Sequence, residues 1–213
     1  MAGSLSLGGK IIATHTGPKG AGTVSANNVS LGNSVQFPAG HILQVQSKNE
    51  TAARNTSSTS FVEIHTDFFA ELTTIGNNSK ILVQGTLHLG PSDPGLRMGT
   101  AMYRSIAGAA YAVTDFRGDE AGSRSRAIFG STSGARNDQQ LNAGFSFVDI
   151  PQQNAGTIVR YKPYWFCEHA SYTINLNRSQ TDGDYFNHPR LASSIVIMAV
   201  SYTHLTLPTN VAV

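Results

Sequence analysis

At residues 61–65 the chain reads Phe61-Val62-Glu63-Ile64-His65, in which the apolar residues Val62 and Ile64 alternate with the polar residues Glu63 and His65. In an extended strand, Phe61, Glu63 and His65 share one face, while Val62 and Ile64 point to the other. A period of two is typical of a β-strand and does not fit the 3.6-residue period of an amphipathic helix. This stretch therefore predicts a strand.

Short runs of the same kind recur on both sides of this stretch, and β-branched and aromatic residues concentrate in them. No stretch of about 12 residues keeps apolar side chains at helical spacing with caps at its ends. The pattern predicts an all-β fold, an antiparallel β-sandwich or jelly roll. Its predicted strands are Ile42–Gln46, Ser60–His65, Phe68–Thr73, Ile81–Leu89, Ala101–Arg104, Ala110–Thr114, Ala127–Phe129, Ala143–Val148, Thr157–Phe166, Tyr172–Asn175 and Ser194–Val200.

The first 36 residues differ in texture from the rest of the chain. They are rich in Gly, Ser, Thr and Asn, and their short apolar pieces are separated by Gly-Pro and Asn-Asn pairs that interrupt regular structure. We expect residues 1–36 to form an extended arm that attaches or trimerises the protein, and residues 37–200 to form the sandwich. The stretch Arg117–Gln139, dominated by Gly, Ser, Arg and Asp, predicts a long loop pair at one end of the sandwich.

Composition excludes several classes of partner and site. Only 13% of the residues are charged and the net charge is +2, which gives no strong field for nucleic acid or anionic lipid. The single cysteine, Cys167, excludes an intrachain disulfide framework and a multi-thiolate metal site. No basic start is followed by an apolar run, and nowhere are about 18 consecutive residues apolar. We expect synthesis in the cytoplasm without a signal peptide, and no membrane or nucleic-acid partner.

Several segments, in order over residues 37–198, resemble small tail-fibre-like structural proteins of marine and metagenomic phages, which have a C-terminal β-sandwich. The arm residues Gly8-Gly9-Lys10-Ile11-Ile12-Ala13-Thr14-His15 are similar to arms of such proteins. The segments in the sandwich are Phe37-Pro38-Ala39-Gly40-His41-Ile42-Leu43-Gln44-Val45, Ser57-Ser58-Thr59-Ser60-Phe61-Val62, Ser79-Lys80-Ile81-Leu82-Val83, Tyr103-Arg104, Phe147-Val148-Asp149-Ile150-Pro151, Tyr161 and Ser194-Ile195-Val196-Ile197-Met198.

The resemblance implies a non-enzymatic virion protein, a homotrimeric tail fibre or appendage tip that recognises a glycan or protein of the host surface. It implies contact with other virion proteins through the arm, and it carries over no catalytic residue, cofactor or metal. Two alternatives stay open. The first is a carbohydrate-binding module or polysaccharide depolymerase, and the second is a capsid decoration protein. The residues that would bind a receptor are not identified by the sequence.

The last 13 residues carry a second resemblance. Ser201–Thr209 reads like one frame of a translated sequencing adapter. We hypothesise that the genuine sequence ends near Ala199 or Val200 and that residues 201–213 are a non-native tail. The alternative is that residues 201–207 continue the last strand.

Two short motifs suggest binding chemistry. Arg117-Gly118-Asp119 is the tripeptide of integrin ligands, but a bacterial virus meets no integrin, so coincidence is the favoured interpretation. The glycines of Gly17-Pro18-Lys19-Gly20-Ala21-Gly22-Thr23 suggest a phosphate cradle. Their spacing matches neither the P-loop nor the dinucleotide fingerprint, and no helix follows, so a flexible arm is favoured.

Metal-binding candidates are few. Glu63, His65 and Asp67 would share one face of a strand and offer ligands to a cation, although a solvated polar face is the favoured interpretation. Asp182-Gly183-Asp184-Tyr185 resembles half of a calcium loop without its distal glutamate, so a tight turn is favoured. No two histidines stand at metal-ligand spacing within one element, and those before the tail are His15, His41, His65, His88, His169 and His188.

Two further groups suggest catalysis or sugar binding. Cys167-Glu168-His169 raises a Cys/His nucleophile, but no third orienting group is visible, and a buried, apolar Cys167 is favoured. In the strand with Tyr161, the side chains Tyr164 and Phe166 share a face opposite Trp165, and any exposed ring would be a sugar-stacking candidate; packing in the core is favoured. Pro163 suggests that this strand lies at a sheet edge or has a bulge.

Overall fold

The computed structural model describes residues 3–7, 10–16, 23–25, 40–132 and 138–200. They divide into two compact units, Met1–Phe37 and Pro38–Val213. All regular structure within these ranges is β-strand. Among the same residues there is no helix of the length and apolarity that crossing a membrane requires.

The first unit contains a small antiparallel sheet where the sequence suggested only an extended arm. Its strand order is β1-β2-β3, with a bulge between Leu5 and Ser6. These short strands are rich in Ser and Thr and carry only short apolar pieces, which is why the sequence pattern did not predict this sheet. Its strands are β1 (Gly3–Leu7), β2 (Lys10–Thr16) and β3 (Thr23–Ser25).

The second unit contains two six-stranded antiparallel sheets. In the first, β8 pairs β12 on one edge and β15, then β14, on the other; β4 pairs β15 and β5 pairs β14. Its strands are β4 (Ile42–Glu50), β5 (Arg54–Thr56), β8 (Lys80–Pro91), β12 (Leu141–Asp149), β14 (Ile174–Leu176) and β15 (Ser193–Val200).

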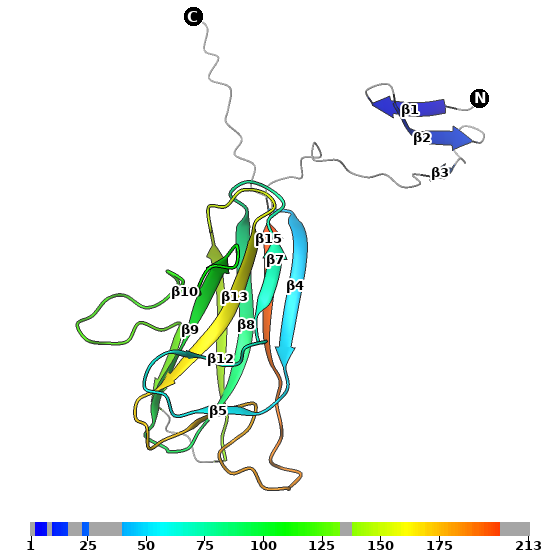
Figure 1. The fold of residues 1–213 in the computed structure, drawn as a ribbon. Coiled ribbons are helices and arrows are strands. Elements are labelled where there is room, and N and C mark those ends of the chain that lie inside the picture. The colour runs from blue at the N-terminus through cyan, green and yellow to red at the C-terminus, as the bar shows by residue number, and fades with distance from the viewer. Residues whose placement is uncertain (1–2, 8–9, 17–22, 26–39, 133–137, 201–213) are drawn as a thin grey trace, which may run out of the picture. The chain divides into compact units, whose positions relative to one another are not determined.

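In the second sheet, β13 pairs β9 on one edge and both β6 and β7 on the other, and β10 and β11 pair the far edge of β9. Its strands are β6 (Val62–Glu63), β7 (Ala70–Thr73), β9 (Arg97–Ile106), β10 (Ala112–Val113), β11 (Phe129–Thr132) and β13 (Ile158–Cys167). The stretch predicted as an end loop, Arg117–Gln139, therefore contains β11, and its first part projects beside β9 (Figure 1).

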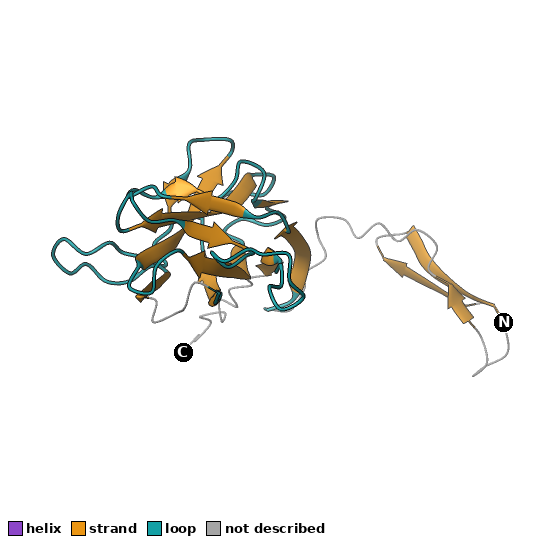
Figure 2. Ribbon diagram, turned by 90° about the horizontal axis from the view of Figure 1, so that it is seen from below, coloured by secondary structure: helices purple, strands orange, loops and turns teal. Residues whose placement is uncertain are grey.

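Some short strands continue the row of another strand: β14 lies in the row of β15, β5 in that of β4, β6 in that of β7 and β10 in that of β11. Counted in rows, the two sheets have the orders β4-β15-β8-β12 and β7-β13-β9-β11. This is the eight-row arrangement of a jelly roll, in which the two sheets face each other as layers (Figures 1 and 2). The all-β sandwich or jelly roll predicted from the sequence is confirmed. Each predicted strand overlaps an observed one, and β5 was missed.

Alternating side chains of both sheets form the core. In β15 the residues Ile195, Ile197 and Ala199 are fully buried, while the residues between them are half-buried on the outer face. Trp165 and Tyr161 of β13 are the largest fully buried side chains of the domain. The burial of apolar side chains from water, to which large rings contribute most per residue, is the main stabilising contribution to a sandwich of this kind.

The register of the paired strands determines which loops lie at the same end of the sandwich. Ile42 of β4 pairs Val200 of β15, and Glu50 pairs Ser193 at the other end of the same two strands. The described part of the domain therefore begins and ends at one end of the sandwich. The opposite end, here called the distal end, carries the loops at 51–53, 92–96, 168–173 and 177–192.

Pro163 does not lie at a sheet edge, as the sequence suggested, because β13 is paired on both sides. On one side, β7 pairs residues 158–161 and β6 pairs residues 164–165, so the ladder is interrupted at Pro163. A proline lacks the N–H that a continuous ladder needs, and the gap between two short strands accommodates it.

Candidate functional site

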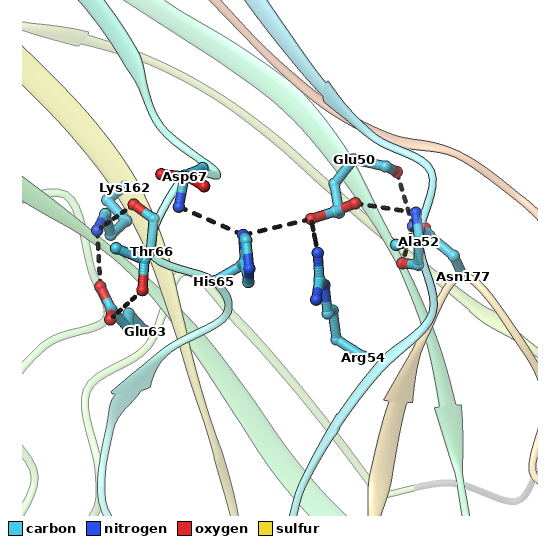
Figure 3. Close-up of polar contacts among 9 residues, drawn as sticks. All are labelled: Glu50, Ala52, Arg54, Glu63, His65, Thr66, Asp67, Lys162 and Asn177. Carbon is cyan, nitrogen blue, oxygen red and sulfur yellow. Dashed lines mark hydrogen bonds and ion pairs between the residues drawn. The ribbon is translucent and has the colours of Figure 1, made fainter.

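The polar cluster predicted at Glu63, His65 and Asp67 lies toward the distal end, but the three side chains do not share a face. Strand β6 ends at Glu63, and a turn follows. His65 Nδ1 accepts a hydrogen bond from the backbone N–H of Asp67 at 3.3 Å and lies 3.8 Å from Glu50 Oε2 (Figure 3). The strand geometry predicted for a shared cation site is therefore wrong, because the chain turns after two paired residues.

Lys162 pairs with Glu63, so the carboxylate of Glu63 is engaged by an ammonium group in place of a cation ligand site. Its Nζ, on a side chain only 5% exposed, donates to Glu63 Oε2 at 2.6 Å and to the carbonyl oxygen of Thr66 at 2.8 Å (Figure 3). The ammonium also lies over the rings of Tyr111 and Phe69, at 4.7 and 5.6 Å from their centroids. The hydrogen bond from Lys162 holds the pKa of Glu63 below its usual value. This pair anchors the 64–67 turn on the sheet.

Glu50 forms a second network beside this turn. Its carboxylate accepts from the backbone N–H of Ala52 at 2.9 Å and from Arg54 Nε and Nη2 at 3.3 and 3.2 Å (Figure 3). Buried Asn177, at a φ of 62°, donates to the carbonyl oxygens of Glu50 and Ala52, and Ser193 Oγ donates to Asn177 Oδ1. The network ties three chain segments together, so it supports the distal loops and leaves no free ligand set.

Cys167 is buried, as the sequence predicted, and its Sγ donates to the carbonyl oxygen of His169 at 3.3 Å. Burial raises the pKa of the thiol. The Glu168 carboxylate accepts from the backbone N–H and Nη1 of Arg97, while the imidazole of His169 packs against Tyr172. The geometry does not pair the sulfur with the imidazole, so it offers no activated nucleophile.

Residues 182–185 lie in the 177–192 loop, where the N–H of Tyr185 donates to the carbonyl oxygen of Gly183, and the first carboxylate of this segment is paired with arginines. Asp182 Oδ2 pairs Arg190 Nη2 at 2.5 Å and Arg178 Nη1 at 3.4 Å. The N–H of Gly183 donates to His188 Nδ1 at 3.2 Å. Within the described ranges, no group of three His, Cys, Asp or Glu side chains is placed to hold a metal. The same loop leaves the side chain of Phe186 fully exposed at the distal end.

The aromatic residues of β13 divide between the two faces of the sheet. Trp165 is in the core, whereas Tyr164 and Phe166 lie on the outer face. There Tyr164 stacks on Tyr103 with ring centroids 3.8 Å apart, and Phe166 meets Phe61 edge to face at 4.8 Å. Partial burial raises the pKa of both tyrosines. These outer rings are half-buried, so they pack on one another more than they face solvent.

The Arg117-Gly118-Asp119 motif lies at the start of the loop between β10 and β11, which projects from the sandwich (Figure 1). The N–H of Gly118 donates to the carbonyl oxygen of Ala127, and Arg126 Nε donates to that of Gly118, so the loop is closed on itself. Asp119 is exposed and Arg117 is half-buried. The glycines at 17–22 and His204 lie outside the described residues.

Sequence reasoning missed a groove between β4 and β7, because its walls come from different sheets. It is open, about 700 Å³ in volume, and lined by Gln44, Gln46 and Lys48 on one wall and by Asp67, Phe69, Glu71 and Arg160 on the other. Glu71 is paired with Arg160. Small-molecule sites combine aromatic or apolar side chains with a few polar groups that orient the ligand, and Phe69 with its polar neighbours makes this groove a candidate for such a site.

No protein-family model matches the sequence, and no curated protein matches it. Solved structures of infectious bursal disease virus are similar in fold. A chain of the Gx strain has 11% identity and a TM-score of 0.42, over 94% of this chain and 42% of that one. A chain of the VP2 subviral particle has 12% identity and a TM-score of 0.38, over 74% and 38%. This chain thus spans less than half the length of either.

Proposed function

We propose that the chain is a non-enzymatic structural protein of a phage virion, a tail-fibre or appendage tip whose distal end contacts the host surface. The observation that carries the proposal is the topology of the second unit. The described residues of the jelly roll begin at Gly40 and end at Val200, both at one end of the sandwich, and the distal loops lie at the other end. Jelly rolls are used by viral capsid and lectin domains, and loops on a rigid scaffold commonly carry binding.

The chemistry of the candidate residues supports a structural role. Glu63, Glu50, Glu168 and Asp182 each accept hydrogen bonds from cationic side chains, so these carboxylates hold loops in place. Such bonds fix the distal loops and the 64–67 turn without assembling a reactive group. The resemblance of residues 37–198 to tail-fibre-like proteins favours the same role.

In this proposal, residues 1–36 join the domain to other virion proteins and associate it as a homotrimer, and the glycan or protein of the host lies at the distal loops. The boundary between the two compact units, at Phe37, is consistent with such a division of labour. Neither cofactor nor metal takes part.

Immunogold electron microscopy of phage particles, with an antibody against the sandwich domain, tests the proposal. We expect gold at the tips of tail appendages. Gold spread over the capsid shell would instead support a decoration protein, and absence of the chain from purified particles would reject a virion role.

A carbohydrate-binding module is the second candidate, and the groove between β4 and β7 favours it. Binding of host-surface polysaccharide by the isolated chain, lost in Gln46→Ala and Asp67→Asn variants but kept in Gln84→Ala on the other face, would support it. Loss of binding only on removal of the exposed ring of Phe186 would place the contact at the distal end.

A further inference from the structure

The outer face of the first sheet carries an apolar row that crosses its four long strands. Val45 of β4 pairs Met198 of β15, Met198 pairs Leu82 of β8, and Leu82 pairs Val148 of β12. Directly paired residues lie on the same face of a sheet. Val45 and Val148, on the two edge strands, are 52% and 57% exposed, and the two central side chains are half-buried.

The surroundings of this row continue its character. Val196, Val200 and Ile42 lie on the same face in the neighbouring rows, and Ile42 is 50% exposed. A single exposed apolar side chain needs no explanation, but a contiguous patch on a soluble domain marks an interaction surface.

The charge of this outer face indicates what kind of partner it can bind. Among the outward side chains that the structure describes on these four strands, Lys80 and His88 are the titratable ones, and no carboxylate occurs. The polar and charged members are Ser47, Asn49, Lys80, Gln84, Thr86, His88, Asn142, Ser146 and Ser194. A face with so little charge gives a charged partner little to recognise, whereas an identical face complements it.

We propose that this face binds the same face of a second copy of the chain, about a two-fold axis parallel to the row. The inference goes beyond the proposed function and does not depend on it. Rotation about this axis places each side chain of the row opposite its own counterpart. It also places Lys80, two residues before Leu82, opposite Gln84 of the other copy, two residues after Leu82.

This axis keeps like charges apart. Lys80 and Lys80 of the second copy are offset by four residues along β8, about 13 Å at a rise of about 3.3 Å per residue, with sheets about 10 Å apart. That separation exceeds the screening length of about 8 Å at physiological salt. Sheets that pack face to face align within about 30°, as the contact requires.

Disulfide trapping tests the axis in the full-length chain, because the native Cys167 is buried and leaves an added cysteine alone on the surface. We expect Val148→Cys to form a disulfide-linked dimer on mild oxidation. Asn142→Cys lies exposed on the same strand and face, six residues from the row, and should stay monomeric on a non-reducing gel. No dimer from Val148→Cys, or an equal yield from Asn142→Cys, would overturn the proposal.

Sedimentation equilibrium provides the second measurement. The double variant Val45→Lys, Val148→Lys changes two exposed positions, so the fold should persist with an unchanged circular dichroism spectrum. We expect its mass to be at most half that of the wild type, whether the wild type is a dimer or a pair of trimers. An unchanged mass would show that the face is covered by another part of the chain or by nothing, and would refute the contact.

Discussion

The hydroxyl of Tyr161 on β13 donates a 2.6 Å hydrogen bond to Asp149 Oδ2 on β12, in the opposite sheet. Arg104 of β9 donates to the same oxygen at 2.6 Å, so one carboxylate joins both sheets inside the sandwich. Burial in this environment raises the pKa of Tyr161, which keeps its hydroxyl protonated as a donor.

Replacement of Asp149 with Ala should therefore be costly. It would leave the buried hydroxyl of Tyr161 and the guanidinium of Arg104 without their partner, a loss of about 3 kcal/mol in the free energy of unfolding. Urea denaturation would measure it. Tyr161→Phe removes one donor and should cost about 1 kcal/mol. An Asp149→Ala cost no greater than that of Tyr161→Phe would contradict the bridging role.

The pair of Glu63 and Lys162 should make stability depend on acid pH. The pKa of Glu63 is lowered from about 4.5 by the hydrogen bond from Lys162, so the unfolded state binds a proton at a higher pH than the folded state. Its contribution is present above pH 4.5 and is lost as the pH falls through the folded pKa.

Urea midpoints measured between pH 3 and pH 6 should fall less steeply for Glu63→Gln than for the wild type. Lys162→Met should flatten the same window, because it removes the group that lowers the pKa of Glu63. A wild-type slope retained in both variants would mean that another carboxylate is responsible.

Gly99 on β9 should not tolerate a side chain. A methyl group there would lie 2.3 Å from Cε1 of Phe166, so Gly99→Ala should destabilise by about 1–3 kcal/mol. Gly144 on the outer face of β12 is the matched control, since nothing lies within 4 Å of its added methyl group. Gly144→Ala should be neutral or slightly stabilising. Thermal unfolding compares the two, and the Phe166→Leu change should partly rescue Gly99→Ala.

The thiol of Cys167 should react with an aromatic disulfide reagent only when the domain unfolds. Its side chain is buried and its pKa is raised, so little thiolate is accessible at neutral pH. Labelling followed by absorbance should be absent in buffer and complete in concentrated urea. Labelling in buffer at the rate of a free thiol would show that the core opens at this point.

Sequence periodicity predicted the strands whose side chains alternate between core and solvent, such as β12 and β15. It did not predict β5, because Arg54-Asn55-Thr56 joins the sheet through its backbone and carries no apolar pattern. It also placed His65 in a strand, although pairing stops at Glu63. A period of two describes one strand and contains no information about where its partner ends.

The contacts of the site residues were harder to predict from the sequence than the fold. The opposite orientation of Tyr164 and Trp165 followed from alternation along one strand. The partners of Glu63 and Asp149 did not, because Lys162 and Arg104 lie 99 and 45 residues away and meet them only through strand register. The groove between β4 and β7 likewise exists only once two sheets are packed.

The pairing of Ile42 with Val200 also determines how the domain bears force. If the two chain ends were pulled apart, β4 and β15 would peel from each other one hydrogen bond at a time. A pull between Gly40 and the 177–192 loop, which leads into β15, instead draws β4 and β15 in opposite directions along their length, so the bonds of the β4–β15 ladder are loaded together in shear. This ladder therefore resists a pull along its strands better than a pull that separates its two ends at Ile42 and Val200.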